Sequence, residues 1–342
     1  MKLDVLILVM LASLTFARSN LVFIEIVSAR SSSARRHLLR SYWVSSCFNR
    51  SDLTRSYMYK FFISSVGDLH EDPNVQRALR VESETHNDII FLDSSPDRDP
   101  AVSRDETYIL DRPTAITSKQ LQAMLYALHL KEPLELYIHV DDDAVLMIPR
   151  LDPLINQHSH PLLFMGYLMQ TPIDPDATDL EIGNHKYECP EGVGNIKCFQ
   201  IGQACDREAK LVGNSSTCFE TRLERSLKIS RFFGNSFSPP WALGMGSVMG
   251  KSIVDFLVTN ADDLKARASA DVQTGFWLAP LSGVRYVQAF GFHDYPRRHS
   301  MFAAGCSEQS VLVHRVRAEN WKEFSRDECV LRCPSEPSEY ES

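Results

Sequence analysis

Glu135-Leu136-Tyr137-Ile138-His139-Val140-Asp141-Asp142-Asp143 is the stretch of the chain that decides the fold. Apolar residues alternate along it, and this period predicts a short buried strand that runs into three consecutive carboxylates. Adjacent aspartates repel one another and oppose burial, so we expect positive charge beside them. In a continuing strand, Asp141 and Asp143 would point to the same side, roughly 7 Å apart.

The carboxylates at the end of this strand predict a metal site. Carboxylate oxygens suit Mg²⁺ or Mn²⁺, which keep coordination positions open for phosphate groups. The alternative is a solvated acidic loop without a metal. The apolar run Ala144-Val145-Leu146-Met147-Ile148, which follows the aspartates directly, argues against that alternative.

The overall composition excludes one class of partner. The chain has 342 residues, enough for one large domain or two small ones, and its formal net charge is -8. With this charge and no long Lys/Arg run, we expect no nucleic-acid binding driven by electrostatics.

The first residues resemble a targeting segment. Residues 1–17 join a short basic start to an apolar run that ends in small residues, which is typical of a signal peptide cleaved after Ala17. A short uncleaved signal anchor is the alternative, although the apolar run is too short to span a bilayer comfortably. In both cases we expect the remaining chain in the secretory lumen, with membrane contact only through this segment.

Cysteines and glycosylation sequons agree with a lumenal protein. The chain holds eight cysteines, an even number that predicts disulfides of open connectivity. No Cys-x-x-Cys pair occurs between Cys189 and Cys218, so a zinc site is not expected there. Asn49 and Asn214 begin N-glycosylation sequons, which would lie in surface loops if used.

The periodicity along the chain predicts an α/β protein. We expect strands at 21–27, 59–66, 88–92 and 161–169, and helices at 36–43, 75–85, 118–130 and 251–260. Thr117 and Gln120 have the spacing of a capping box for the third helix. Residues 238–246 predict a glycine-rich turn, and residues 170–231 predict a disulfide-stapled insertion.

Several motifs then occur in a familiar order. They are Arg36-x-x-x-Arg40-Ser41-Tyr42-Trp43, Asp88-Ile89-Ile90, Ile116-Thr117-Ser118-Lys119, Val140-Asp141-Asp142-Asp143-Ala144-Val145, Pro239-Pro240-Trp241 with Gly244 and Gly246, Ala270-Asp271-Val272-Gln273-Thr274-Gly275, and Val313-His314. In this order the chain resembles the β-1,3-glycosyltransferase family, which contains β-1,3-galactosyltransferases and N-acetylglucosaminyltransferases and is related to Fringe. The resemblance covers roughly residues 21–324.

The resemblance implies a fold and an activity. The fold would be a GT-A type nucleotide-sugar-binding mixed sheet flanked by helices, as one domain at 21–330 with the insertion at 170–231 and an acidic tail at 331–342. The activity would be Mn²⁺-dependent, inverting transfer of galactose or N-acetylglucosamine from a UDP-sugar to a hydroxyl of a glycan acceptor, in a β-1,3 linkage. The family sits in the Golgi apparatus, and secretion is the alternative.

The resemblance also implies roles for individual residues. Asp143 and His314 would bind the metal, with His293 as the alternative imidazole, while Asp141 and Asp142 would orient the ribose and the donor sugar. Asp271 would be the general base, or else a helix N-cap. Arg36, Arg40 and Lys119 would contact uridine or diphosphate, with structural ion pairs as the alternative. Gly244 and Gly246 would bind the donor, with close backbone packing as the alternative.

The chain departs from the family pattern beside the candidate base and in the glycine segment. Ala270 stands where the family has an acidic residue, and the glycine segment lacks the usual Cys-Ser. Ala270 motivates a rival hypothesis, a non-catalytic lumenal or secreted member of the fold that binds glycan or nucleotide-sugar. A second rival is a secreted binding protein in which the acidic strand holds Ca²⁺.

Overall fold

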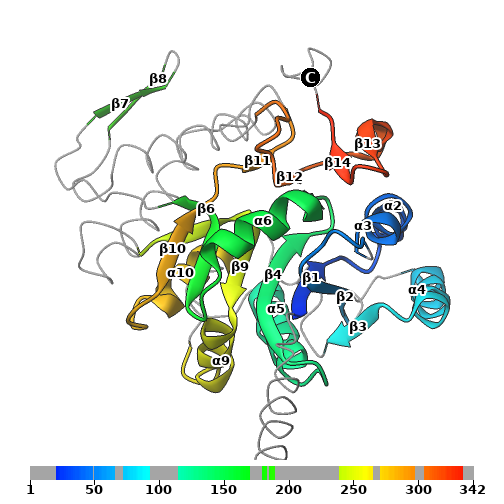
Figure 1. Cartoon of the computed structure of the whole chain (residues 1–342), viewed down its shortest axis with the longest axis horizontal. Helices are drawn as coiled ribbons and strands as arrows, with labels where there is room; N and C mark the ends of the chain where they lie inside the picture. The colour runs from blue at the N-terminus through cyan, green and yellow to red at the C-terminus, as the bar shows by residue number, and fades with distance from the viewer. Residues whose placement is uncertain are drawn as a thin grey trace, which may run out of the picture.

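The computed structural model describes residues 21–48, 50–65, 72–92, 115–169, 179–182, 185–188, 239–264, 270–296 and 304–333. A large mixed sheet crosses this part of the molecule in the order β10-β6-β9-β4-β1-β2-β3 (Figure 1). Its strands are β1 (Leu21–Val27), β2 (Ser56–Ser64), β3 (Ile89–Leu92), β4 (Leu134–Asp141), β6 (Leu163–Met169), β9 (Trp241–Gly250) and β10 (Arg285–Gln288). The predicted α/β class, a mixed sheet flanked by helices, is confirmed.

Helices and smaller sheets surround this sheet. The helices are α2 (Ser33–Leu38), the π-helix η1 (Leu39–Val44), α3 (Ser45–Cys47), α4 (Pro73–His86), α5 (Ala115–Leu128), α6 (Ile148–His158), α9 (Lys251–Thr259), α10 (Ala270–Leu278) and the 3₁₀-helix η2 (Ala318–Glu323). The smaller sheets join β11 (Phe292–Asp294), β12 (Leu312–His314) and β5 (Val145–Leu146), then β13 (Phe324–Ser325) with β14 (Val330–Leu331), and β7 (Asp179–Ile182) with β8 (His185–Glu188). Of the predicted insertion at 170–231, only β7 and β8 are described.

The centre of the sheet is buried on both faces, which explains its apolar sequence. β1 pairs in parallel with β2 and β4, and every residue of β1 is buried. Val22, Ile24 and Ile26 belong to the apolar cluster on one face, while Phe23 belongs to the cluster on the other. Parallel strands covered on both faces carry such near-continuous apolar runs.

Two local predictions were wrong. The helix predicted to start after a cap at Thr117 begins at Ala115, so Thr117 lies inside α5. The glycine-rich turn predicted at 238–246 is largely β9, which pairs antiparallel with both β4 and β6. Glycines are required here by close approach between strands, because a methyl group at Gly166 would lie 2.8 Å from Ala242 Cβ.

The described C-terminal part of the chain is fastened to the N-terminal part. Figure 1 shows β13 and β14 near the blue helices α2 and α3, and a disulfide joins Cys47 of α3 to Cys329. A second disulfide joins Cys306 to Cys333. The prediction of disulfides is therefore confirmed for four of the eight cysteines.

Some predictions lie outside the described residues. They are the targeting segment at 1–17, the sequons at Asn49 and Asn214, and the end of the tail from residue 334. Within the described residues, the helices are all too short or too polar to cross a bilayer.

Candidate functional site

The acidic motif forms a turn between two strands. β4 ends at Asp141, and the amide of Ala144 donates to the Asp141 carbonyl at 3.2 Å, so the chain reverses instead of continuing as a strand. β5 then pairs antiparallel with β12, which ends at His314. This pairing brings His314 to the acidic turn, although it lies far from it in sequence.

Asp141, Asp143 and His314 form the candidate metal centre. Their ligand atoms all lie within 4.8 Å of one another. His314 Nε2 is 3.4 Å from Asp141 Oδ2 and 3.2 Å from Asp143 Oδ1. Two carboxylates and one imidazole are a donor set that Mn²⁺ accepts, and all three side chains are only partly buried, which leaves room for further ligands. The residues present therefore fit a divalent metal.

A further carboxylate orients the imidazole. Asp294 Oδ1 lies 2.9 Å from His314 Nδ1, and Arg315 Nη1 donates to Asp294 Oδ2 at 2.9 Å. Metal-binding histidines usually have such a carboxylate on the ring nitrogen that faces away from the metal. Asp294 follows His293 directly in the sequence, but no motif marks it as part of the site.

Charge at the centre also favours a cation. Burial alone would lower the pKa of His314, but hydrogen bonds to Asp141, Asp143 and Asp294 raise this pKa to about 11. These three carboxylates therefore favour the protonated imidazole of His314. A bound dication would replace that proton, since a histidine binds metal in its deprotonated form.

His293, the alternative ligand, lies elsewhere. It is buried, with Nδ1 2.9 Å from the Asp294 carbonyl oxygen and Nε2 2.8 Å from Ser310 Oγ. Both ring nitrogens thus have partners within the fold, and burial lowers the pKa of this histidine. The geometry favours His314 over His293 as a ligand.

Asp142 points away from the metal centre. Its carboxylate accepts from Ser28 Oγ at 2.7 Å and from Arg35 Nη1 at 2.8 Å. Arg35 Nη1 also lies 3.8 Å from Asp143 Oδ2, and the Arg35 side chain is 55% exposed. The positive charge expected beside the aspartates is therefore Arg35 together with His314, and Arg35 was missed because only its neighbour matched a motif.

Asp271 and Asp141 share one cavity of about 190 Å³. Asp271 lies in the first turn of α10, after Ala270, so it is not the residue before the helix. The remaining wall comes from α5, β4, β6, β9 and α10 and includes Gln120, His139, Gly244 and Thr274. A carboxylate and a candidate metal ligand thus face the same space from different elements.

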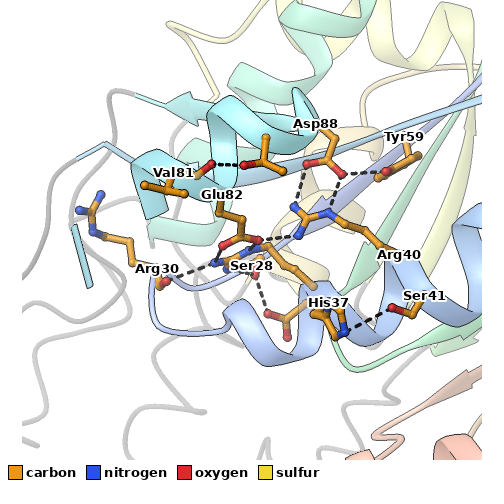
Figure 2. Close-up of polar contacts among 12 residues, drawn as sticks. Ser28, Arg30, His37, Arg40, Ser41, Tyr59, Val81, Glu82 and Asp88 are labelled. Atoms are coloured by element: carbon orange, nitrogen blue, oxygen red, sulfur yellow. Dashed lines mark hydrogen bonds and ion pairs between the residues drawn. The ribbon is translucent and has the colours of Figure 1, made fainter. Parts of the chain in front are cut away.

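The two arginines predicted to contact the nucleotide make ion pairs within the fold. Arg36 is fully buried and donates to Glu82 through Nε at 2.9 Å and Nη2 at 2.8 Å. Arg40 donates to both oxygens of Asp88 at 2.8 Å and to Glu82 at 2.7 Å, and Tyr59 donates to the same Asp88 (Figure 2). This geometry favours the structural alternative for both.

Of Lys119, Gly244 and Gly246, only Gly244 lines the cavity. Lys119 is buried on α5 beside Gln120, and the cavity wall contains Gln120, not Lys119. Gly244 belongs to the wall, where a methyl group would lie 3.6 Å from Asp271 Oδ2. Gly246 packs closely, since a methyl group there would lie 2.6 Å from Leu312 Cδ1.

Comparison with known proteins identifies the family. The model of the Galactosyltransferase family matches residues 34–288. Mouse beta-1,3-galactosyltransferase 6 is 34% identical over 85 residues, which are 25% of this chain and 24% of the length of that protein.

Solved structures give weaker matches. Mouse xyloside xylosyltransferase 1 in its apo form has a TM-score of 0.35 at 11% identity, covering 86% of this chain and 97% of its own. An active-site mutant of LgtC has a TM-score of 0.38 at 11% identity, covering 85% of this chain and 86% of its own.

Proposed function

Because this chain belongs to the Galactosyltransferase family, we propose that it transfers galactose from UDP-galactose to a hydroxyl group of a glycan. Family membership supports glycosyltransferase activity in general. The donor sugar, the linkage and the metal are part of the proposal. N-acetylglucosamine is the alternative sugar. The proposed linkage is β-1,3, formed with inversion at the anomeric carbon.

One observation carries the proposal. Asp141, a member of the cluster able to hold a divalent metal, and the separate carboxylate Asp271 line a single cavity. Inverting transfer needs these two functions on the two sides of the sugar: stabilisation of the leaving diphosphate and removal of a proton from the acceptor. A solvated acidic loop would have neither the imidazole nor the facing carboxylate.

The proposed reaction is a single displacement. The acceptor oxygen forms a bond to the anomeric carbon as the bond from that carbon to the UDP oxygen breaks. Asp271 takes the proton of the acceptor hydroxyl, and UDP leaves with the electron pair. Arg35, half-exposed beside Asp143, is placed to pair with the negative charge of the leaving group.

Asp141, Asp143 and His314 would hold the metal, proposed to be Mn²⁺. When bound, it would supply Lewis-acid stabilisation of the diphosphate charge. Asp294 keeps the His314 ring in place, and Ser28 with Arg35 holds Asp142 out of the centre.

We further propose that the protein works in the Golgi apparatus, attached to the membrane only through its N-terminal segment, on glycans of glycoproteins or glycolipids. Secretion is the alternative location. The predicted targeting segment and the disulfides between described cysteines support a lumenal protein.

A donor panel read by UDP release tests the function. UDP-galactose, UDP-N-acetylglucosamine and UDP-glucose are offered with Mn²⁺ and a panel of glycan acceptors. We expect UDP-galactose to be used best, with a loss of at least about 100-fold in kcat for Asp271→Asn and Asp143→Ala. Equal activity of the wild type and both variants would reject the assigned roles.

The non-catalytic rival predicts a different pattern. It is motivated by Ala270, which stands in place of an acidic residue beside Asp271. Calorimetry with UDP and Mn²⁺ would then show binding, while no donor and acceptor pair gives turnover. A preference for Ca²⁺ over Mn²⁺ without any effect of UDP would instead support the secreted binding protein.

A further inference from the structure

A column of polar side chains leads from the apolar core to the cavity. Alternate residues of a strand share one face, so Tyr137, His139 and Asp141 lie on the same face of β4. Glu25 of β1 is the register partner of His139 on the neighbouring strand. The two inner members, Tyr137 and Glu25, are fully buried, whereas His139 and Asp141 reach the cavity wall.

Glu25 fixes the imidazole of His139. Its Oε2 accepts from Tyr137 Oη at 2.5 Å and lies 2.7 Å from His139 Nδ1. Its Oε1 has no hydrogen-bond partner among the described residues. A carboxylate buried this deeply costs several kcal/mol unless other groups compensate it, and Tyr137 and His139 compensate it on Oε2 alone.

The ring geometry leaves one nitrogen for a ligand. Since Nδ1 faces Glu25, Nε2 is the polar atom that His139 can offer to the cavity whose wall it forms. Gln120 contributes to the same wall, and its Oε1 also lacks a hydrogen-bond partner within the described part of the chain. A buried polar group without a partner requires an explanation, and a molecule bound in the adjoining cavity would supply one.

We propose that His139, held by Glu25, is a specificity-determining residue that binds a hydroxyl of the donor sugar through Nε2. This inference rests on the proposed function, because the sugar of a UDP-sugar bound at Asp141 and Asp143 would extend into this cavity. A hydroxyl both donates and accepts, so the contact forms with either protonation state of the ring. His139 would thus distinguish sugars by the hydroxyl that it pairs with, while the nucleotide is bound elsewhere.

The test separates the sugar from the nucleotide. Calorimetry with Mn²⁺ measures the Kd of UDP, UDP-galactose and singly deoxygenated UDP-galactoses for wild type, His139→Gln and Tyr137→Phe. We expect one deoxy analogue to bind wild type about tenfold more weakly than UDP-galactose. In His139→Gln that difference disappears, while the Kd of UDP stays within about twofold of wild type.

Tyr137→Phe is the matched control, because it also removes a hydrogen bond to Glu25 Oε2 but does not touch the cavity wall. It should keep the full difference between UDP-galactose and the deoxy analogue. If His139→Gln keeps the difference, or both variants lose it equally, the inference is overturned although the proposed function stands. If wild type binds neither UDP nor UDP-galactose, the proposed function fails and the inference with it. His139→Asn replaces His139→Gln should the latter not fold, with thermal unfolding as the check.

Discussion

At the residue scale, the candidate metal centre depends on a side chain that is not a candidate ligand. Asp294 is buried and holds the His314 ring through Nδ1. In Asp294→Asn the amide cannot replace a full negative charge, so the ring is held less firmly and is less basic. We expect Mn²⁺ affinity in the presence of UDP to fall by about 10- to 100-fold, as measured by electron paramagnetic resonance titration.

The exposed Asp263→Asn is the control for this titration, since Asp263 lies on a surface far from β12 in sequence. Its Mn²⁺ affinity should equal that of wild type. Unchanged affinity in Asp294→Asn would show that His314 does not bind the metal, or binds it without help from Asp294.

The neighbouring residues Arg35 and Arg36 show that a sequence pattern does not resolve which of two adjacent side chains reaches the site. Arg36 matched a motif, yet its side chain turns inward to Glu82, while Arg35 reaches Asp142. Successive residues of a helix point about 100° apart, so the choice between them depends on the helix phase relative to β4. Only the packed structure sets that phase.

At the scale of elements, β9 offers a matched pair of glycine substitutions. In Gly246→Ala the new methyl group would lie 2.6 Å from Leu312 Cδ1 and 3.0 Å from the His139 carbonyl oxygen. Because the backbone there cannot yield easily, we expect a loss of about 1–3 kcal/mol in the free energy of unfolding. Urea denaturation measures it.

Gly244→Ala should behave in the opposite way. Its methyl group would make an ordinary contact 3.6 Å from Asp271 Oδ2, so stability should stay close to wild type. The methyl group would occupy cavity space beside the proposed base, and transfer activity should fall by about tenfold or more. A comparable loss of stability in both variants would contradict the assignment of Gly246 to close packing and of Gly244 to the cavity wall.

The ion pair between Arg40 of η1 and Asp88, the residue before β3, predicts a pH dependence. Burial alone would raise the pKa of Asp88, but hydrogen bonds from Arg40 and Tyr59 lower it below its ordinary 3.8. Since the folded-state pKa lies below the unfolded value, the contribution is present above about pH 4 and is lost as the pH falls through the folded-state pKa. Asp88→Asn should therefore cost about 3 kcal/mol at pH 7 and clearly less at pH 3.

Thermal unfolding between pH 7 and pH 3 measures this effect. The exposed pair of Lys251 and Asp255 on α9 supplies the control, because Asp255→Asn should change stability little at any pH. A cost of Asp88→Asn that is equal at both pH values would exclude the ion pair with Arg40 as its source.

At the scale of the whole molecule, local periodicity predicted the sheet better than it predicted the site. The positions of β1 and α9 follow from their apolar patterns, because the apolar residues within each element are the ones that the core buries. The approach of His314 to Asp143 depends on pairing between β5 and β12, elements of two and three residues with no pattern of their own. β9 was missed since its glycines serve contacts with neighbouring strands, which a single segment does not contain.

The two disulfides between described cysteines differ in how much of the chain they constrain. Cys47 and Cys329 are 282 residues apart in sequence, and Cys306 and Cys333 are 27 apart. In the chain-entropy account a longer loop restricts the unfolded chain more, and the difference between these two amounts to about 2 kcal/mol. Replacing Cys47 and Cys329 by serine should thus lower the free energy of unfolding by about 2 kcal/mol more than replacing Cys306 and Cys333.

Guanidinium denaturation of the two double variants measures the difference. The variants are matched because each replaces two cysteines by serine. The larger loss has a structural reason as well, because the bond from α3 to Cys329 holds β13 and β14 near the N-terminal helices (Figure 1). Equal losses would show that the unfolded chain is already restricted by other contacts. A larger loss on removing the bond between Cys306 and Cys333 would place the stabilising effect in the short loop that they close, instead of in the long loop closed by Cys47 and Cys329.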